Sequence, residues 1–167
     1  MIRIEPATSD DIHQLTELLS ALFTQEADFG PNHAKQARGL GMIIEEPRLG
    51  HIFVAREGNE VVGMVNLLFA VSTAEGGFVV LLEDLIVRPS HRGKGTGSAL
   101  LRHAIDFART NGFPRITLLT DRINEKAIRF YERHGFQLSA MVPMRLKLDG
   151  VSGNAVPGGI RPLNPCK

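Results

Sequence analysis

The residues best suited to chemistry lie where an apolar segment meets a loop rich in glycine and positive charge. Residues 82–87 read LEDLIV, and residues 92–98 read RGKGTGS. Glycine lets a backbone turn tightly and approach a ligand closely. The free amides and the positive dipole end of a following helix attract anions. The segment from Leu82 to Ser98 is therefore predicted to bind a ligand that carries phosphate.

Two familiar phosphate loops fit this segment poorly. A Walker A loop needs Ser or Thr after its Gly-Lys pair, but Gly95 follows Lys94, and Arg88 stands where the first glycine belongs. A dinucleotide fingerprint would place its third glycine at Ser98, although Asp121 lies near the expected acidic position. ATP or GTP hydrolysis is therefore disfavoured, and a dinucleotide-binding oxidoreductase remains as the weaker alternative.

Two adjacent acids, Glu83 and Asp84, interrupt the apolar segment. Neighbours in a strand point to opposite faces, so at least one of them should face a packed interior or a cleft. Burial raises the pKa of a carboxylate, and a base closer to neutrality can take a proton from an ammonium. Glu83 is the candidate base. An equal alternative is a structural acid that bonds the backbone or a basic residue.

The elements that position these residues change in type along the chain. Alternating apolar residues predict strands, and a period near 3.6 predicts helices. Together they predict a mixed α/β sheet, largely antiparallel, with helices over it. Strands are expected at 2–4, 51–56, 61–71, 78–87, 115–120, 136–141 and 144–148, and helices at 12–22, 34–44, 95–111 and from Asn124 to before Gly135.

Length and composition predict one domain, residues 1–149, followed by a Gly/Pro-rich tail, residues 150–167. The 19 basic residues nearly balance the 18 acidic ones, so broad electrostatic capture of nucleic acid or an anionic membrane is not expected. The single cysteine, Cys166, and the absence of a charged-then-apolar leader favour an unprocessed cytoplasmic protein. The six histidines form no zinc pattern, so no metal is expected.

Two motifs at compatible spacing carry a resemblance to a known family. The arrangement Arg92-x-x-Gly95-x-Gly97 resembles motif A of the GNAT family of N-acetyltransferases, which use acetyl-CoA. Residues 124–136, which read NEKAIRFYERHGF, resemble the second motif of that family. The resemblance covers about residues 2–148 and implies a single-domain GNAT fold with splayed central strands.

The resemblance also implies which residues bind acetyl-CoA. The amides of the glycine loop would hold the pyrophosphate beside two cationic side chains, and the preceding strand would pair with the pantetheine arm. Two residues of the later helix, seven apart, would border the cofactor from one face. These expected residues are Leu85, Ile86, Val87, Arg92, Gly93, Lys94, Gly95, Thr96, Gly97, Ser98, Asn124 and Tyr131.

Catalytic roles follow from the same resemblance. Tyr131, the only tyrosine, would protonate the departing thiolate, which the reference pKa values of about 10 for tyrosine and about 8.5 for a thiol permit. Leu82-Glu83-Asp84 resembles the polyamine-acetylating branch, in which the first acid serves as base.

The acceptor would be a primary amine: a small amine, a polyamine or a lysine-like group. Residues 25–28 with Glu45 and Glu46 could form an acidic entrance for it, although ordinary surface acids explain them equally well. A non-catalytic acyl-CoA sensor is the competing class, since it would need the glycine loop but neither Glu83 nor Tyr131. A homodimer is compatible with such a fold, but no residue specifies an interface.

Overall fold

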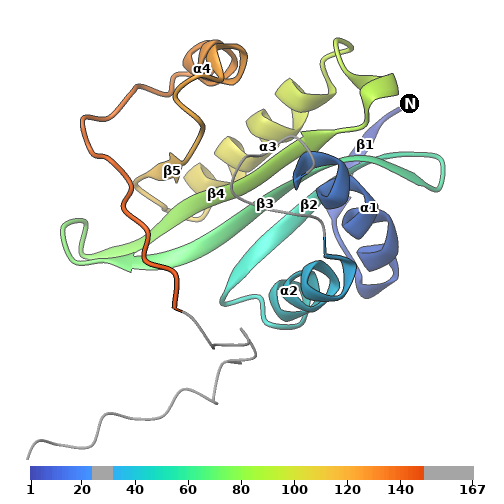
Figure 1. The fold of residues 1–167 in the computed structure, drawn as a ribbon, viewed down its shortest axis with the longest axis horizontal. Helices are drawn as coiled ribbons and strands as arrows, with labels where there is room; N and C mark the ends of the chain where they lie inside the picture. Colours follow the sequence, from blue (N-terminus) through green and yellow to red (C-terminus); the bar gives the residue numbers. More distant parts are fainter. Residues whose placement is uncertain (24–31, 149–167) are drawn as a thin grey trace, which may run out of the picture.

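A five-stranded sheet in the order β1-β2-β3-β4-β5 forms the centre of the molecule (Figure 1). The computed structural model describes residues 1–23 and 32–148. In chain order the elements are β1 (Arg3–Pro6), the 3-10 turn η1 (Ser9–Asp11), α1 (Ile12–Phe23), α2 (His33–Glu45), β2 (Gly50–Glu57), β3 (Glu60–Ser72), β4 (Gly77–Val87), the 3-10 turn η2 (Pro89–His91), α3 (Thr96–Thr110), β5 (Ile116–Leu118) and α4 (Glu125–Glu132).

The first four strands are antiparallel, and only β4 and β5 run parallel. A tight turn joins the antiparallel strands β2 and β3, and Gly58 permits this turn with a φ of 60°. The helix α3 then carries the chain across to β5, as a parallel connection requires. This largely antiparallel order confirms the mixed α/β class and does not match the parallel sheet of dinucleotide-binding folds.

Helices cover both faces of the sheet, with α1 and α2 on one face and α3 on the other (Figure 1). Each face has its own core. The α3 side buries Leu100, Leu101 and Ala104 against strand residues such as Val65. The opposite side buries Leu15, Leu18, Leu19 and Leu40 against Ile52, Val54, Met64 and Ile86.

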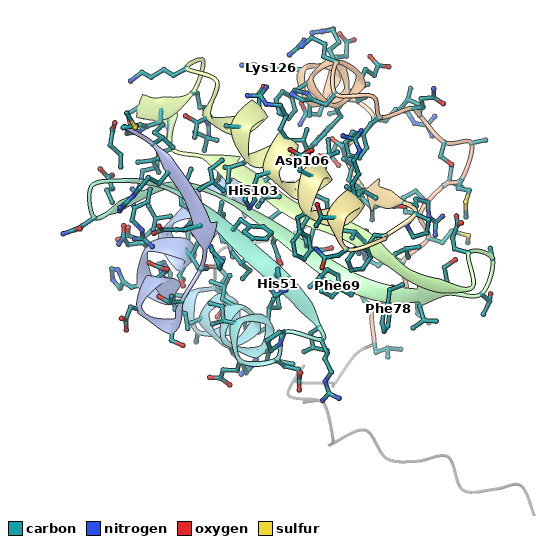
Figure 2. All side chains as sticks on the ribbon, turned by 180° about the vertical axis from the view of Figure 1, so that it is seen from behind. His51, Phe69, Phe78, His103, Asp106 and Lys126 are labelled. Carbon is teal, nitrogen blue, oxygen red and sulfur yellow. The ribbon has the colours of Figure 1, made fainter. Side chains whose placement is uncertain are left out.

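A group of rings lies on the α3 side of the sheet (Figure 2). His51 meets Phe69 and Phe107 edge to face, with ring centroids 5.6 and 5.1 Å apart. Phe53 meets His103 in the same way at 4.6 Å. Desolvation lowers the pKa of His51, which favours its neutral form within this apolar group.

The central strands are bulged and splayed, which confirms the feature that the family resemblance implied. The register between β3 and β4 shifts at Asn66/Leu67, so Glu83 is an extra residue of β4 that has no partner on β3. The ladder between β4 and β5 contains only residues 80–82 of β4. Residues 84–87 of β4 therefore lie beyond the end of this ladder.

Two expected strands are absent from the part of the chain that the structure describes. Residues 136–141 and 144–148 have no regular secondary structure, and Met144, Leu146 and Leu148 are exposed. Their alternating pattern suits a strand, but a strand also needs a partner that offers backbone groups. The three-residue β5, shorter than the expected 115–120, offers few.

None of the described helices is long and apolar enough to cross a membrane. The predicted tail, residues 150–167, lies outside the described residues.

Candidate functional site

The end of β4 presents an open backbone edge. The amide of Arg88 donates to the carbonyl of Val62 on β3 at 2.8 Å. Because hydrogen-bonding direction alternates along an antiparallel strand, Ile86 also faces β3, whereas Leu85 and Val87 point their backbone groups the other way. They point to the side where β5 no longer pairs. Of the three predicted strand residues, Leu85 and Val87 thus turn backbone groups to this open side, where the carbonyl of Val87 accepts a hydrogen bond from Arg92.

The loop after β4 is fastened at its start. Arg92 donates from Nε to the carbonyl of Val87 at 2.9 Å, so part of this guanidinium is used within the loop. His91 contacts Ser90 through Nδ1 at 2.9 Å and Glu57 through Nε2 at 3.1 Å. These contacts tie η2 and Arg92 to the end of β4 and to the turn between β2 and β3.

The glycine loop leaves backbone amides available at the start of α3. Gly93 and Gly95 have φ values of +74° and +84°, a left-handed conformation in which an added Cβ would meet open space. The first helical hydrogen bond runs from the amide of Ala99 to the carbonyl of Gly95 at 2.9 Å. The amides of residues 96–98 precede it and have no helical acceptor. Lys94 is exposed beside them. The loop therefore fits an anionic ligand such as a pyrophosphate.

The helix α4 packs against this loop. A Cβ on Gly97 would lie 3.7 Å from a methyl of Val87 and 3.8 Å from the ring of Phe130. The strand end, the first turn of α3 and α4 thus meet at one place. Tyr131 follows Phe130 in α4, so the structure brings it to the same region as the loop.

Tyr131 sits in an apolar setting beside a negative charge. Its ring contacts Phe130 and Phe136 edge to face, with centroids 5.2 and 5.6 Å apart. Desolvation, with a further contribution from the Asp84 carboxylate, raises the pKa of Tyr131 to about 12. The phenol therefore keeps its proton at neutral pH and can act as a donor.

The two acids of β4 occupy different surroundings. Glu83, at the bulge, is exposed, so it is not the enclosed acid of the pair. Asp84 is half-buried and accepts a hydrogen bond from Nδ2 of Asn66 at 3.1 Å. The bulge explains why Asp84 is the enclosed acid, because one extra residue in a strand turns the following side chains to the other face. Sequence reasoning missed Asn66, although one amide within the apolar run of β3 was a usable signal.

Two other predictions concern Asn124 and the acidic entrance. Asn124 caps α4 by accepting the amide of Ala127 at 3.1 Å, so the Oδ1 of its side chain is used at the helix end. Glu46 pairs with Arg48 at 2.9 Å, and residues 25–28 lie outside the described chain. The acidic entrance therefore gains no support from Glu46.

A cavity of about 580 Å³ lies at the other end of α3, between its second half, β5 and the segment after α4. Ile105, Arg109, Phe113 and Phe136 contribute to its lining, and none of the predicted site residues does. The described residues contain no group of three or more His, Cys, Asp or Glu suited to hold a metal ion.

Comparison with known proteins gives a consistent result. The model of the Acetyltransferase (GNAT) family matches residues 12–136. An uncharacterized N-acetyltransferase, YhfO of Bacillus subtilis, is 32% identical over 122 residues, which cover 71% of this chain and 81% of that protein.

The streptothricin acetyltransferase of Streptomyces lavendulae is 49% identical over 55 residues, covering 33% of this chain and 29% of that longer protein. Among solved structures, the integron cassette protein HFX_CASS3 from the mobile metagenome of Cole Harbour Salt Marsh superposes with a TM-score of 0.75 at 30% identity. The superposed region covers 87% of this chain and 90% of the HFX_CASS3 chain.

Proposed function

The chain belongs to the GNAT family of acetyltransferases, and on that premise we propose that it moves the acetyl group of acetyl-CoA directly to a primary amine. The observation that carries the proposal is the continuity of the site. An open strand edge at Leu85 and Val87 leads into the amides of residues 96–98, which precede the first helical hydrogen bond of α3. The helix α4, which carries Tyr131, packs against this loop through Phe130. The acceptor class includes small amines, polyamines and lysine-like groups.

Separate parts of this site suit separate parts of acetyl-CoA. The backbone of Leu85 and Val87 would pair with the pantetheine arm as an added strand does. The amides from Gly93 to Ser98, with the positive charge of Arg92 and Lys94, would hold the pyrophosphate. Bound acetyl-CoA supplies a thioester carbonyl that an amine can attack.

Protons would move at two points. The amine nitrogen forms a bond to the acetyl carbon as the carbon–sulfur bond breaks, and Tyr131 gives its proton to the departing sulfur. The carboxylates at the bulge, Glu83 with Asp84, receive the proton that the ammonium loses, directly or through water. Glu83 remains the candidate base from the family resemblance, and its exposure leaves it open to an arriving amine. Holding both reactants in one cleft supplies much of the acceleration.

The substitution Tyr131→Phe tests this proposal. It keeps the ring that packs on Phe130 and Phe136 but removes the acid, so turnover should fall by about 100-fold. Thiol release from acetyl-CoA over a panel of amines measures turnover, and calorimetry should give nearly unchanged acetyl-CoA affinity. Unchanged turnover would exclude Tyr131 as the acid. Tight acetyl-CoA binding without release on any amine would favour the sensor class instead.

Three further expectations stay predictions: a domain that ends at residue 149, a homodimer, and a cytoplasmic location.

A further inference from the structure

A buried amide of β3 faces Asp84, the residue that follows the β4 bulge. Asn66 lies between Val65 and Leu67, which both pack in the core on the α3 side. Because side chains alternate along a strand, Asn66 points to the opposite face, the one that α1 and α2 cover. Its exposure is only 5%, and it is directly opposite Asp84 in the ladder.

One polar atom of Asn66 lacks a partner among the described residues. A carboxylate only accepts hydrogen bonds, so the amide nitrogen Nδ2 must face Asp84, as the 3.1 Å contact shows. The oxygen Oδ1 is then left buried with no donor in the described chain. An unsatisfied buried acceptor costs about 1–3 kcal/mol, so this oxygen is suited to receive a donor from a ligand.

The charge at this place favours one kind of donor. Asp84 supplies a carboxylate directly opposite Asn66, and Oδ1 of the same amide adds a neutral acceptor. The charge of Asp84 also contributes to the raised pKa of Tyr131, the proposed acid. A primary ammonium group offers three donors and a positive charge to such a set.

We propose that Asn66 and Asp84 form a subsite that binds the protonated amine of the acceptor, with Asn66 as a positioning residue. Oδ1 of Asn66 and the Asp84 carboxylate accept N–H groups of the ammonium, and the amide keeps the carboxylate in place through Nδ2. The subsite selects a cationic amine over a neutral molecule of the same shape. Its link to acetyl transfer rests on the proposed function, but binding of the cation does not.

Ligand-observed NMR on the full chain near neutral pH tests this subsite with n-butylammonium and the neutral n-butanol as probes. A site built to bond a polar group rejects an analogue that lacks it, so n-butanol should bind more weakly by about tenfold or more. Asn66→Leu and Asp84→Asn should each weaken the binding of n-butylammonium by a similar factor. The matched controls are Asn59→Leu in the exposed β2–β3 turn and Asp106→Asn on the exposed side of α3, and both should leave its affinity unchanged.

Kinetics add a readout that a merely structural role would not move. Asn66→Leu should raise KM for the amine while leaving KM for acetyl-CoA unchanged. Asp84→Asn preserves side-chain volume, so it keeps the proposal testable if Asn66→Leu does not fold.

The possible outcomes separate this subsite from the proposed function. Equal binding of the two probes, no binding of n-butylammonium to the wild-type chain, or wild-type affinity in both variants would overturn the subsite and leave a buried water as the donor to Oδ1. Binding of the cation as expected, with no thiol release on any amine, would uphold the subsite and refute acetyl transfer. Thiol release by the wild-type chain, with an unchanged KM for the amine in Asn66→Leu, would uphold acetyl transfer and refute the subsite.

Discussion

Tyr131 reports on its own surroundings, because the chain contains one tyrosine and no tryptophan. Near-UV absorbance of the phenolate therefore measures this ring alone. The apolar contacts with Phe130 and Phe136 and the charge of Asp84 both favour the neutral phenol. A direct titration thus tests whether the folded chain keeps this phenol protonated, as an acid must be before it gives up a proton.

The native phenol should titrate with a pKa of about 12, and the denatured chain with the ordinary tyrosine value of about 10. Asp84→Asn should lower the native pKa without bringing it to the ordinary value, since desolvation is the larger cause, while Asp106→Asn should leave it unchanged. Because folding raises this pKa, the stability that the neutral phenol contributes is full below pH 10 and is lost as pH rises towards 12. A native midpoint equal to the denatured one would show that Tyr131 is exposed to water.

For single residues, the sequence identified which side chains could do chemistry better than it predicted what surrounds them. Tyr131 stood out within a matched motif, and Glu83 and Asp84 stood out as acids in an apolar strand. Which acid is enclosed depends on one extra residue in β4, and no periodicity reveals where a bulge falls. The importance of Asn66 depends on a partner 18 residues away, which only the β3–β4 register supplies.

Among the elements, the turn from β4 to α3 does the most to shape the site. The sequence predicted a strand, a loop and a helix at this place, and all three formed. The splay was implied by family resemblance alone, since the pattern at 115–120 suggested a longer β5 than the three residues that pair. Strand length depends on what the neighbouring chain can pair with, which a local pattern does not contain.

Gly95→Ala should show that this turn serves a ligand. A φ of +84° disfavours alanine, so the free energy of unfolding should fall by about 1 kcal/mol. Gly76→Ala is the matched control, because Gly76 has a φ of +68° in the β3–β4 turn and equally open space around it. Urea unfolding should give similar losses for both, whereas calorimetry should show weakened acetyl-CoA binding only for Gly95→Ala. Equal affinities in the two variants would remove the loop from the cofactor site.

For the whole molecule, hairpin signals and apolar stripes were enough to predict the layers. The antiparallel order of β2, β3 and β4 follows from short turns, and the stripe of α3 matches the core that it buries. The prediction of closing strands at 136–141 and 144–148 was wrong. The alternation of apolar and polar residues there indicates an amphipathic segment but does not specify a strand for it to pair with. Long-range pairing is the part of a fold that a local pattern specifies least.

One partly buried ionic group joins three elements at the start of the chain. Arg56 of β2 donates from Nη2 to Asp11 of η1 at 2.8 Å and from Nε to Glu5 of β1. The amide of Thr8 also donates to Asp11 at 2.9 Å. Burial alone would raise the pKa of Asp11, but the bonds from Thr8 and Arg56 outweigh it, and the pKa lies below its usual value.

The stability of the whole fold should therefore depend on acid through Asp11. Because folding lowers this pKa, the contribution is full above the unfolded value of about 3.9 and is lost as pH falls through the lower native value. Asp11→Asn should cost about 2 kcal/mol at neutral pH and flatten the decline of stability at low pH, since Arg56 loses its charged partner. Asp10→Asn, on the same turn but exposed, should preserve the wild-type profile in urea unfolding from neutral to acid pH. Parallel profiles for all three proteins would mean that this group does not hold β1, η1 and β2 together.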